Sequence, residues 1–218
     1  MTFTRTPLEH ALPVVIIQTR IEEGSGFEMI TMCCTQKLLR RLRIANPEAI
    51  AMPPTNALGN WYVNLVYIGR TQIVIATSER SLLTVLLPAA DLCNSLVVNL
   101  VDTTYLLLQE IGIGSDCAER EAGAMQPALI ARTESRSVLA SMNDFSLSLD
   151  SYWHNGLAPM EIMLRFAATP KSALMSEGGP TGNPAEMTKA LLGTSGKRAR
   201  IRIKNDRHGE SLHYPIEG

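Results

Sequence analysis

Two apolar, β-branched segments joined by a short turn constrain the fold of this chain more than any other feature. In the first, Trp61–Ile68, alternate positions place Trp61, Val63, Leu65 and Tyr67 on one face, and Gly69-Arg70 separates it from the second, Thr71–Thr77. Alternation with a period of two and a two-residue glycine turn predict a β-hairpin. A second turn at Ser78–Ser81 leads to a third predicted strand, Leu82–Leu87. We therefore expect a compact three-stranded antiparallel sheet.

Apolar residues at helical spacing flank this sheet on both sides in the chain. Helices are predicted over residues 35–44, where Thr35 is placed to cap the first turn, over 91–110, and from Ser135 to about residue 153, with a shorter one over 160–168. Gly112 and Gly114 are expected to end the helix over 91–110, and a polar loop is expected from there to Pro127. The predicted fold class is α+β, with the three-stranded antiparallel sheet packed against three or four helices.

The chain divides into three zones. Residues 1–29 form an expected N-terminal extension, residues 30–170 the α+β domain, and residues 171–218 a Gly/Pro-rich tail. The tail holds eight basic and five acidic residues, although the whole chain of 218 residues has a formal charge of -1. A hydrophobic content of 45% excludes a wholly disordered chain, and the near-neutral balance argues against a protein devoted to nucleic acid.

Cysteine spacing and hydropathy bear on the compartment. The four cysteines lack the short spacer of zinc ribbons and redox pairs, so we expect reduced thiols, no metal and no cofactor. The apolar run at residues 11–17 lacks a signal peptide's charged start and is too short to span a bilayer. The apolar stretch over residues 82–113 is interrupted by charged and amide side chains. We predict a cytoplasmic protein with no membrane partner.

Two segments of the predicted domain carry a resemblance. Trp61-Tyr62-Val63-Asn64-Leu65 and the later segment Arg136–Asp144 (RSVLASMND) resemble the two signature segments of a bacterial domain-of-unknown-function family. In that family a Lys-Leu-rich helix comes first, as with Lys37-Leu38-Leu39 here. The resemblance covers residues 30–170, and Ala140 stands where the family pattern implies a glycine. It implies no activity.

The segment Arg136–Asp144 is the main candidate site. If it is helical, Val138, Met142 and Phe145 face the core, small polar side chains form a second face, and Arg136 begins a third stripe. Small residues at this spacing suit either an internal packing seam, with Arg136 bridging a distant carboxylate, or a ligand or partner site. The alternative local fold makes residues 128–139 a strand, with a helix starting near Ser141. The candidate binding residues are Arg136, Ser137, Ser141, Asn143, Asp144 and Asn64.

Two polar residues outside this segment have competing interpretations. Asn64 lies on the strand face opposite Trp61, where it would either contact a ligand or face solvent. His154 follows the last predicted turn of its helix, where a histidine interacts favourably with the helix dipole. A general base needs a nucleophile or carboxylate within hydrogen-bond reach, and the neighbouring sequence supplies none. We therefore expect His154 to cap the helix.

Basic residues gather in two places, residues 37–43 and residues 197–207. The second alternates isoleucine with basic side chains, which suits an edge strand with one basic face, but it lacks an aromatic residue for base stacking. A solvated tail or an acidic protein partner explains it equally well. The candidate nucleic-acid-binding residues are Lys197, Arg198, Arg200, Arg202 and Lys204.

Several kinds of catalytic machinery are missing from the sequence. Gly193–Lys197 lacks the glycine spacing of a phosphate loop, and no dinucleotide fingerprint, nucleophile elbow or zinc-protease motif occurs. We therefore expect a non-enzymatic binding or regulatory module, with a protein partner or a nucleic acid. The alternative is a small metal-independent phosphodiester-cleaving enzyme of toxin–antitoxin or phage-defence type. In it Arg136 would stabilise negative charge and Asp144 or His154 would move the proton.

Overall fold

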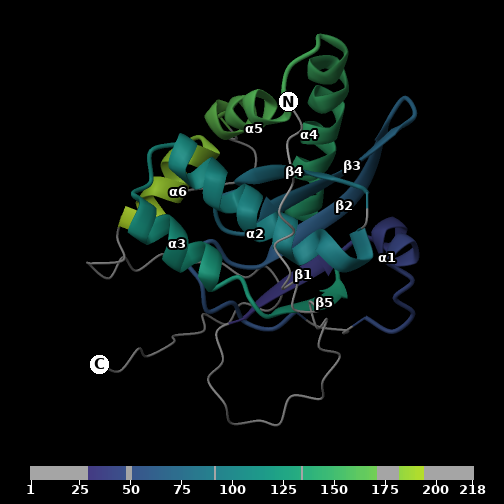
Figure 1. Ribbon diagram of the computed structural model, residues 1–218, viewed down its shortest axis with the longest axis horizontal. Helices are drawn as coiled ribbons and strands as arrows, with labels where there is room; N and C mark the ends of the chain where they lie inside the picture. The colour runs from purple at the N-terminus through teal and green to yellow at the C-terminus, as the bar shows by residue number, and fades with distance from the viewer. Residues whose placement is uncertain (1–28, 48–50, 91, 134, 171–181, 194–218) are drawn as a thin grey trace, which may run out of the picture.

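The structure is a computed structural model that describes residues 29–47, 51–90, 92–133, 135–170 and 182–193 (Figure 1). Within these residues one mixed sheet is flanked by helices on both faces. The strands are β1 (Ile30–Cys34), β2 (Trp61–Ile68), β3 (Thr71–Ser78), β4 (Thr84–Pro88) and β5 (Ala128–Arg132). The helices are α1 (Gln36–Leu42), α2 (Leu92–Glu110), α3 (Ser115–Gly123), α4 (Arg136–His154), α5 (Pro159–Ala168) and α6 (Pro184–Gly193).

The predicted meander is confirmed. β2 pairs antiparallel with β3 over their whole lengths, from Trp61 opposite Ser78 to Ile68 opposite Thr71, and β3 pairs antiparallel with β4. The third strand begins at Thr84 rather than at Leu82. Leu82 has a positive φ of 59° and its amide donates to the Ser78 carbonyl, so this residue still belongs to the turn.

The prediction that the sheet has three strands, all antiparallel, is wrong. Two further strands, β1 and β5, make it a five-stranded mixed sheet. The order is β4-β3-β2-β1-β5, and β1 is parallel to both β2 and β5. All five residues of β1 are buried. A parallel strand buried on both faces shows no alternation of apolar and polar side chains, so β1 lacks the pattern that identified the meander.

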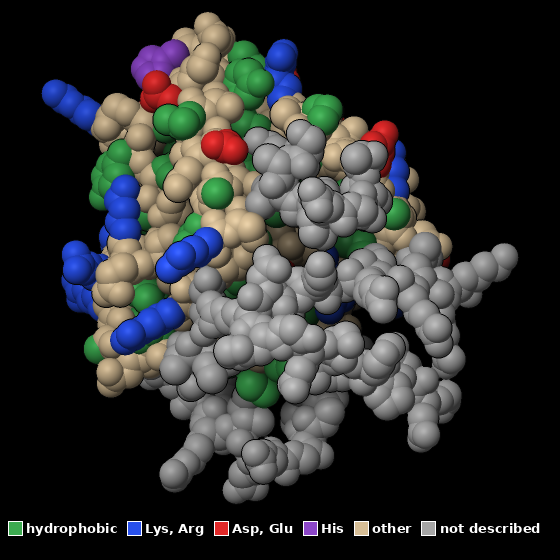
Figure 2. All heavy atoms as spheres, turned by 180° about the vertical axis from the view of Figure 1, so that it is seen from behind, with side chains coloured by type: hydrophobic (Ala, Val, Ile, Leu, Met, Phe, Trp, Pro, Cys, Tyr) green, Lys and Arg blue, Asp and Glu red, His purple; other side chains and the backbone are tan. Residues whose placement is uncertain are grey.

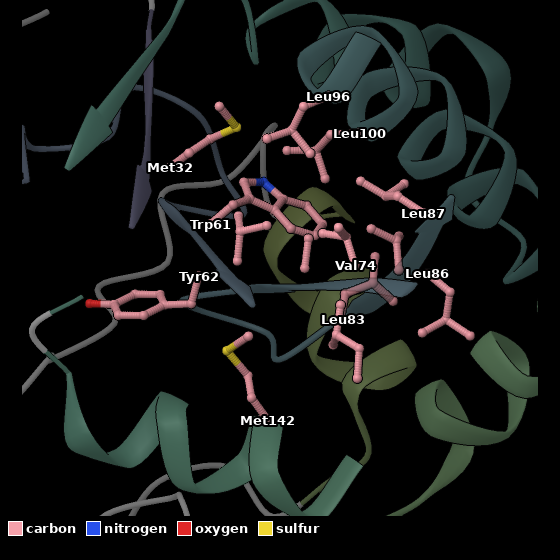
Figure 3. Close-up of a cluster of buried hydrophobic side chains, with 14 of the residues drawn as sticks. Met32, Trp61, Tyr62, Val74, Leu83, Leu86, Leu87, Leu96, Leu100 and Met142 are labelled. Atoms are coloured by element: carbon pink, nitrogen blue, oxygen red, sulfur yellow. The ribbon is translucent and has the colours of Figure 1, made fainter. Parts of the chain in front are cut away.

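The two faces of the sheet pack against different helices. On one face Trp61 of β2 lies with Met32 of β1 and with Leu96 and Leu100 of α2 (Figure 3). On the other face Tyr62 lies on the side of Met142, which α4 contributes (Figure 3). α5 packs against β4 and contacts both α2 and α4. The core therefore has two apolar layers separated by the sheet, as expected for helices on both faces.

Two helices occur where the sequence predicted none. α3 lies between Gly114 and Pro127, where we expected a polar loop, and its Ala118 and Ala122 are buried. α6 lies within residues 171–218, expected to be a tail, and it packs against α5 with Leu192 buried in the core. The other expected helices are present, which gives six in the described residues rather than three or four.

None of the helices in the described ranges is both long and apolar enough to span a bilayer. The longest, α2 and α4, each have 19 residues, and α4 carries charged residues along its length.

Candidate binding surface

The first helix is attached to the sheet through a polar contact at the end of β1. Thr35 occupies the N-cap position of α1, but its side chain makes no capping hydrogen bond. Its hydroxyl instead donates to Oδ1 of Asn64 on β2 at 2.8 Å, and its backbone amide donates to the Val63 carbonyl at 3.0 Å. Asn64 is half-buried, so this candidate binding residue fixes the start of α1 rather than projecting into solvent.

Every charged residue on the exposed face of α1 is basic. Leu38, Leu39 and Leu42 are buried, which orients the remaining side chains outward. The exposed charged residues are Lys37, Arg40, Arg41 and, at the C-cap, Arg43. Cations near a helix C-terminus interact favourably with the helix dipole, so the last turn of α1 is stabilised by the same residues that make its surface positive.

The start of α4 is held against the sheet in a similar way. Ser135 caps the helix and its Oγ accepts from the amide of Val138 at 3.4 Å. The backbone of Ser135 also hydrogen-bonds to the hydroxyl of Tyr62, a β2 residue whose pKa is raised mainly by burial. Ser137 Oγ lies 3.0 Å from Ser135 Oγ. These contacts place the exposed Arg136 beside the ends of the strands.

The ends of the parallel strands bring these elements together. In the sheet register Cys34, the last residue of β1, pairs with Val63 on one side and with Arg132 of β5 on the other. Arg132 is exposed and lies four residues before Arg136. We call the resulting set the basic surface; it consists of Lys37, Arg40, Arg41, Arg43, Arg132 and Arg136.

Charge on the basic surface is not neutralised by ion pairs with the described carboxylates. The two salt bridges between described residues join His154 to Asp150 and Arg165 to Glu161, all on α4 and α5. Figure 2 shows several lysine and arginine side chains along the left side of the molecule, and the acidic side chains on that side lie higher in the view. The arrangement suits an anionic partner.

The candidate residues on α4 are divided by the structure. Val138, Met142 and Phe145 are buried, which confirms the predicted core face. Ser137, Asn143 and Asp144 are exposed. Ser141 is 1% exposed, and its hydroxyl has no hydrogen-bond partner in the described part of the chain. Ser141 is thus the one candidate on this helix that belongs to the interior, and no described carboxylate pairs with Arg136 as a packing seam would require.

The residues of the enzymatic alternative do not converge. Arg136 and Asp144 are eight residues apart on one helix, which places them about 12 Å apart along its axis. His154, ten residues beyond Asp144, has its Nδ1 2.7 Å from the Asp150 carbonyl at the helix end, which is the contact expected of a capping histidine. No group of three or more His, Cys, Asp or Glu in the described ranges could hold a metal ion.

The cysteines of β1 are poorly placed for nucleophilic chemistry. Cys33 and Cys34 are buried, and burial raises the pKa of the Cys34 thiol far above its ordinary value. Since the thiolate is the reactive form, Cys34 stays protonated at neutral pH.

The sequence analysis did not identify a buried carboxylate on α3. Glu121 of α3 is 5% exposed, and its Oε1 accepts from Asn56 Nδ2 at 2.9 Å and from the Leu58 amide at 2.8 Å. Its Oε2 accepts from the Ala57 amide at 3.1 Å. Arg80 donates to the carbonyls of Asn56 and Ala57. Both carboxylate oxygens are therefore engaged in fixing the loop that leads into β2, which makes Glu121 structural.

Little in the sequence signals this role. Glu121 directly follows two other charged residues, Glu119 and Arg120, and only the burial of Ala118 and Ala122 on the same helix shows that this face turns inward. Burial raises the pKa of Glu121, and the hydrogen bonds from the loop oppose that rise.

The candidate nucleic-acid-binding residues Lys197, Arg198, Arg200, Arg202 and Lys204 lie outside the described residues. No curated protein and no solved structure matches the chain. One family model matches, over residues 31–186, a range that runs from β1 into α6 and includes the whole basic surface. On the strength of that match, this chain belongs to the family described as a domain of unknown function, DUF6933.

Proposed function

We propose that this protein is a non-enzymatic binding module that uses the basic surface to bind nucleic acid. The observation that carries the proposal is that six exposed basic side chains belong to α1, to the last residue of β5 and to the first residue of α4, and that both helices start next to the paired ends of two parallel strands. None of the six forms an ion pair with a described carboxylate. Lys and Arg in such a cluster bind phosphates and release condensed counterions, which gives an affinity that depends on salt.

The distribution of acidic residues supports this location. The exposed acidic residues of α2, α3 and α6 are Asp102, Glu110, Asp116, Glu119 and Glu186. α2 packs against α3, and α2 and α6 each pack against α5, whereas α1 packs against β2. A near-neutral chain is thereby polarised, with one surface that attracts phosphates and another that repels them. Net charge alone argued against nucleic acid, but recognition depends on the local field.

The α4 residues have different roles in this proposal. Arg136 contacts phosphate, and the exposed Ser137 and Asn143 donate further hydrogen bonds from the next turns of the helix. Asp144 repels phosphate and limits the contact to the first half of α4. Asn64 and Ser141, which are half-buried and buried, act through the fold and not by contact.

The test measures binding of a fluorescent oligonucleotide to the full chain at about 50 and about 200 mM salt. The variant Arg40→Gln/Arg41→Gln removes two charges from the basic surface while keeping side chains that favour a helix. We expect weaker binding and a salt dependence whose slope falls by about one per phosphate contact removed. The matched control, Arg120→Gln/Lys189→Gln, removes the same charge from exposed positions on α3 and α6 and should bind as the wild type does.

A second full-chain variant replaces Lys197, Arg198, Arg200, Arg202 and Lys204 with glutamine. If this variant loses binding while the α1 variant retains it, the tail and not the basic surface is the nucleic-acid site, and the proposal is wrong in its location. If the wild type binds no oligonucleotide at either salt concentration, nucleic acid is not the partner, and an acidic protein surface becomes the chemistry to test.

The proposal includes a regulatory role in a bacterial cytoplasm, with Trp61–Leu65 and Arg136–Asp144 as segments shared within the family. The first segment places Tyr62 and Asn64 under the starts of α4 and α1. The second holds Arg136 and its polar neighbours. The two segments together supply the scaffold and the contact residues of one surface, which is the pattern expected if both serve the same binding function.

A further inference from the structure

An exposed aromatic ring lies at the border of the basic surface. Tyr67, near the end of β2, is 51% exposed, although the residues on either side of it are half-buried or buried. Nζ of Lys37 lies over its ring, 4.1 Å from the centroid. The ring is thereby linked to α1, whose next charged residues, Arg40 and Arg41, follow one turn along the helix.

Polar side chains contact the exposed Tyr67 side chain. Gln72 pairs with it across the hairpin, and the Gln72 side-chain amide lies 3.5 Å from the tyrosine hydroxyl. The turn Gly69-Arg70 follows directly, and Arg70 is exposed. The half-exposed ring thus contacts Lys37 and Gln72, on a strand whose other residues are buried or half-buried.

We propose that Tyr67 stacks on an unpaired base, so that the nucleic acid bound by this protein is single-stranded. The inference rests on the proposed function and narrows its ligand. Aromatic side chains beside a basic groove stack on successive bases of single strands, whatever the base, because every base has a π face. A duplex offers its phosphates to the basic surface but no free base face to Tyr67.

The experiment compares a single-stranded oligonucleotide of about 12 nucleotides with the duplex of the same sequence, using the full chain at about 50 mM salt. Tyr67→Leu keeps an apolar side chain but removes the π face, and Tyr67→Phe keeps the ring. We expect Tyr67→Leu to weaken single-strand binding about tenfold and to leave duplex binding unchanged, and Tyr67→Phe to bind as the wild type does. Thermal unfolding checks that both variants remain folded.

A 2-aminopurine base in the single strand gives a direct readout, because stacking quenches its fluorescence. Quenching by the wild type and by Tyr67→Phe, but not by Tyr67→Leu, is the expected result. Equal binding of single strand and duplex, with Tyr67→Leu unaffected, overturns this inference and leaves nucleic-acid binding by the basic surface intact. Failure of the wild type to bind either oligonucleotide overturns the proposed function itself.

Discussion

Replacing Glu121 with alanine should destabilise the fold through the loop that precedes β2. The substitution removes the acceptor of two buried donors, the Leu58 amide and the Asn56 side-chain amide, and of the Ala57 amide at the edge of the site. An unsatisfied buried donor costs about 1–3 kcal/mol. Relief of the desolvated carboxylate offsets part of that loss. We expect the free energy of unfolding to fall by about 2–4 kcal/mol, which lowers Tm by about 5–15 °C.

The assay is urea-induced unfolding followed by circular dichroism, with Glu119→Ala as the matched control. Glu119 lies two residues away on the same helix and is exposed, so its removal should change the free energy of unfolding by less than about 0.5 kcal/mol. Glu121→Gln should fall between Glu121→Ala and the wild type. Its oxygen serves the two donors of Oε1, but its amide group faces the Ala57 amide, another donor. Equal stability of Glu121→Ala and Glu119→Ala would refute the structural role of the loop contacts.

The same residue predicts the sign of a pH dependence. Burial raises the pKa of Glu121 above its unfolded value near 4.5, so between these two pKa values the folded state holds more protons than the unfolded state. Stability relative to Glu121→Gln should therefore decline as pH rises from about 4.5 through the raised pKa. Glu79, whose pKa burial also raises, is present in both proteins and cancels in the comparison. If the stability of the wild type relative to Glu121→Gln instead increases over this pH range, the hydrogen bonds to the Glu121 carboxylate lower its pKa by more than burial raises it.

Three further substitutions test other contacts. Ser141→Ala should leave the free energy of unfolding unchanged or raise it by up to about 1 kcal/mol in chemical denaturation, because the buried hydroxyl lacks a partner among the described residues. Asn64→Ala should lower the free energy of unfolding by about 1 kcal/mol because it removes the hydrogen bond from Thr35. The double variant Asn64→Ala/Thr35→Val should be no less stable than the less stable of the two single variants. Leu147→Glu, at a position 76% exposed, should shift stability by less than about 0.5 kcal/mol, as measured by thermal unfolding.

The sequence predicts those elements whose patterns arise from local structure. The meander β2-β3-β4 alternates or turns within a few residues, and the helix starting after Ser135 shows a one-sided apolar stripe, so both could be located to within about two residues. β1 could not be located with the same arguments. For β5, the alternative local fold correctly started a strand at residue 128, but the strand ends at Arg132 and α4 starts at Arg136 rather than near Ser141. Each of these strands has five residues, and their hydrogen bonds are made to strands distant in the chain, so no local pattern records the pairing.

The candidate site was predicted in part for the same reason. The exposed charges of residues 37–43 and of Arg136 follow from helical periodicity, which places the leucines and Val138 inward. The inward placement of Ser141 and the bond of Asn64 to Thr35 do not follow, because both depend on which element packs against them. A small polar residue satisfies the spacing of a surface face and of a packed face equally well.

The elements that local patterns miss are the ones that create the basic surface. β1 ends at Cys34 and β5 ends at Arg132, and their parallel pairing sets these ends side by side. The helices that follow, α1 and α4, must then start from the same edge of the sheet, because parallel strands end at the same edge. Charges from two segments far apart in the chain are thereby added on one surface. The meander contributes three further residues of β2: Tyr62 and Asn64 hydrogen-bond to the residues that begin α4 and α1, and Tyr67 contacts Lys37 of the basic surface. The antiparallel strands therefore hold the two helices in place, and the parallel pairing of β1 with β5 brings their starts to the same edge of the sheet.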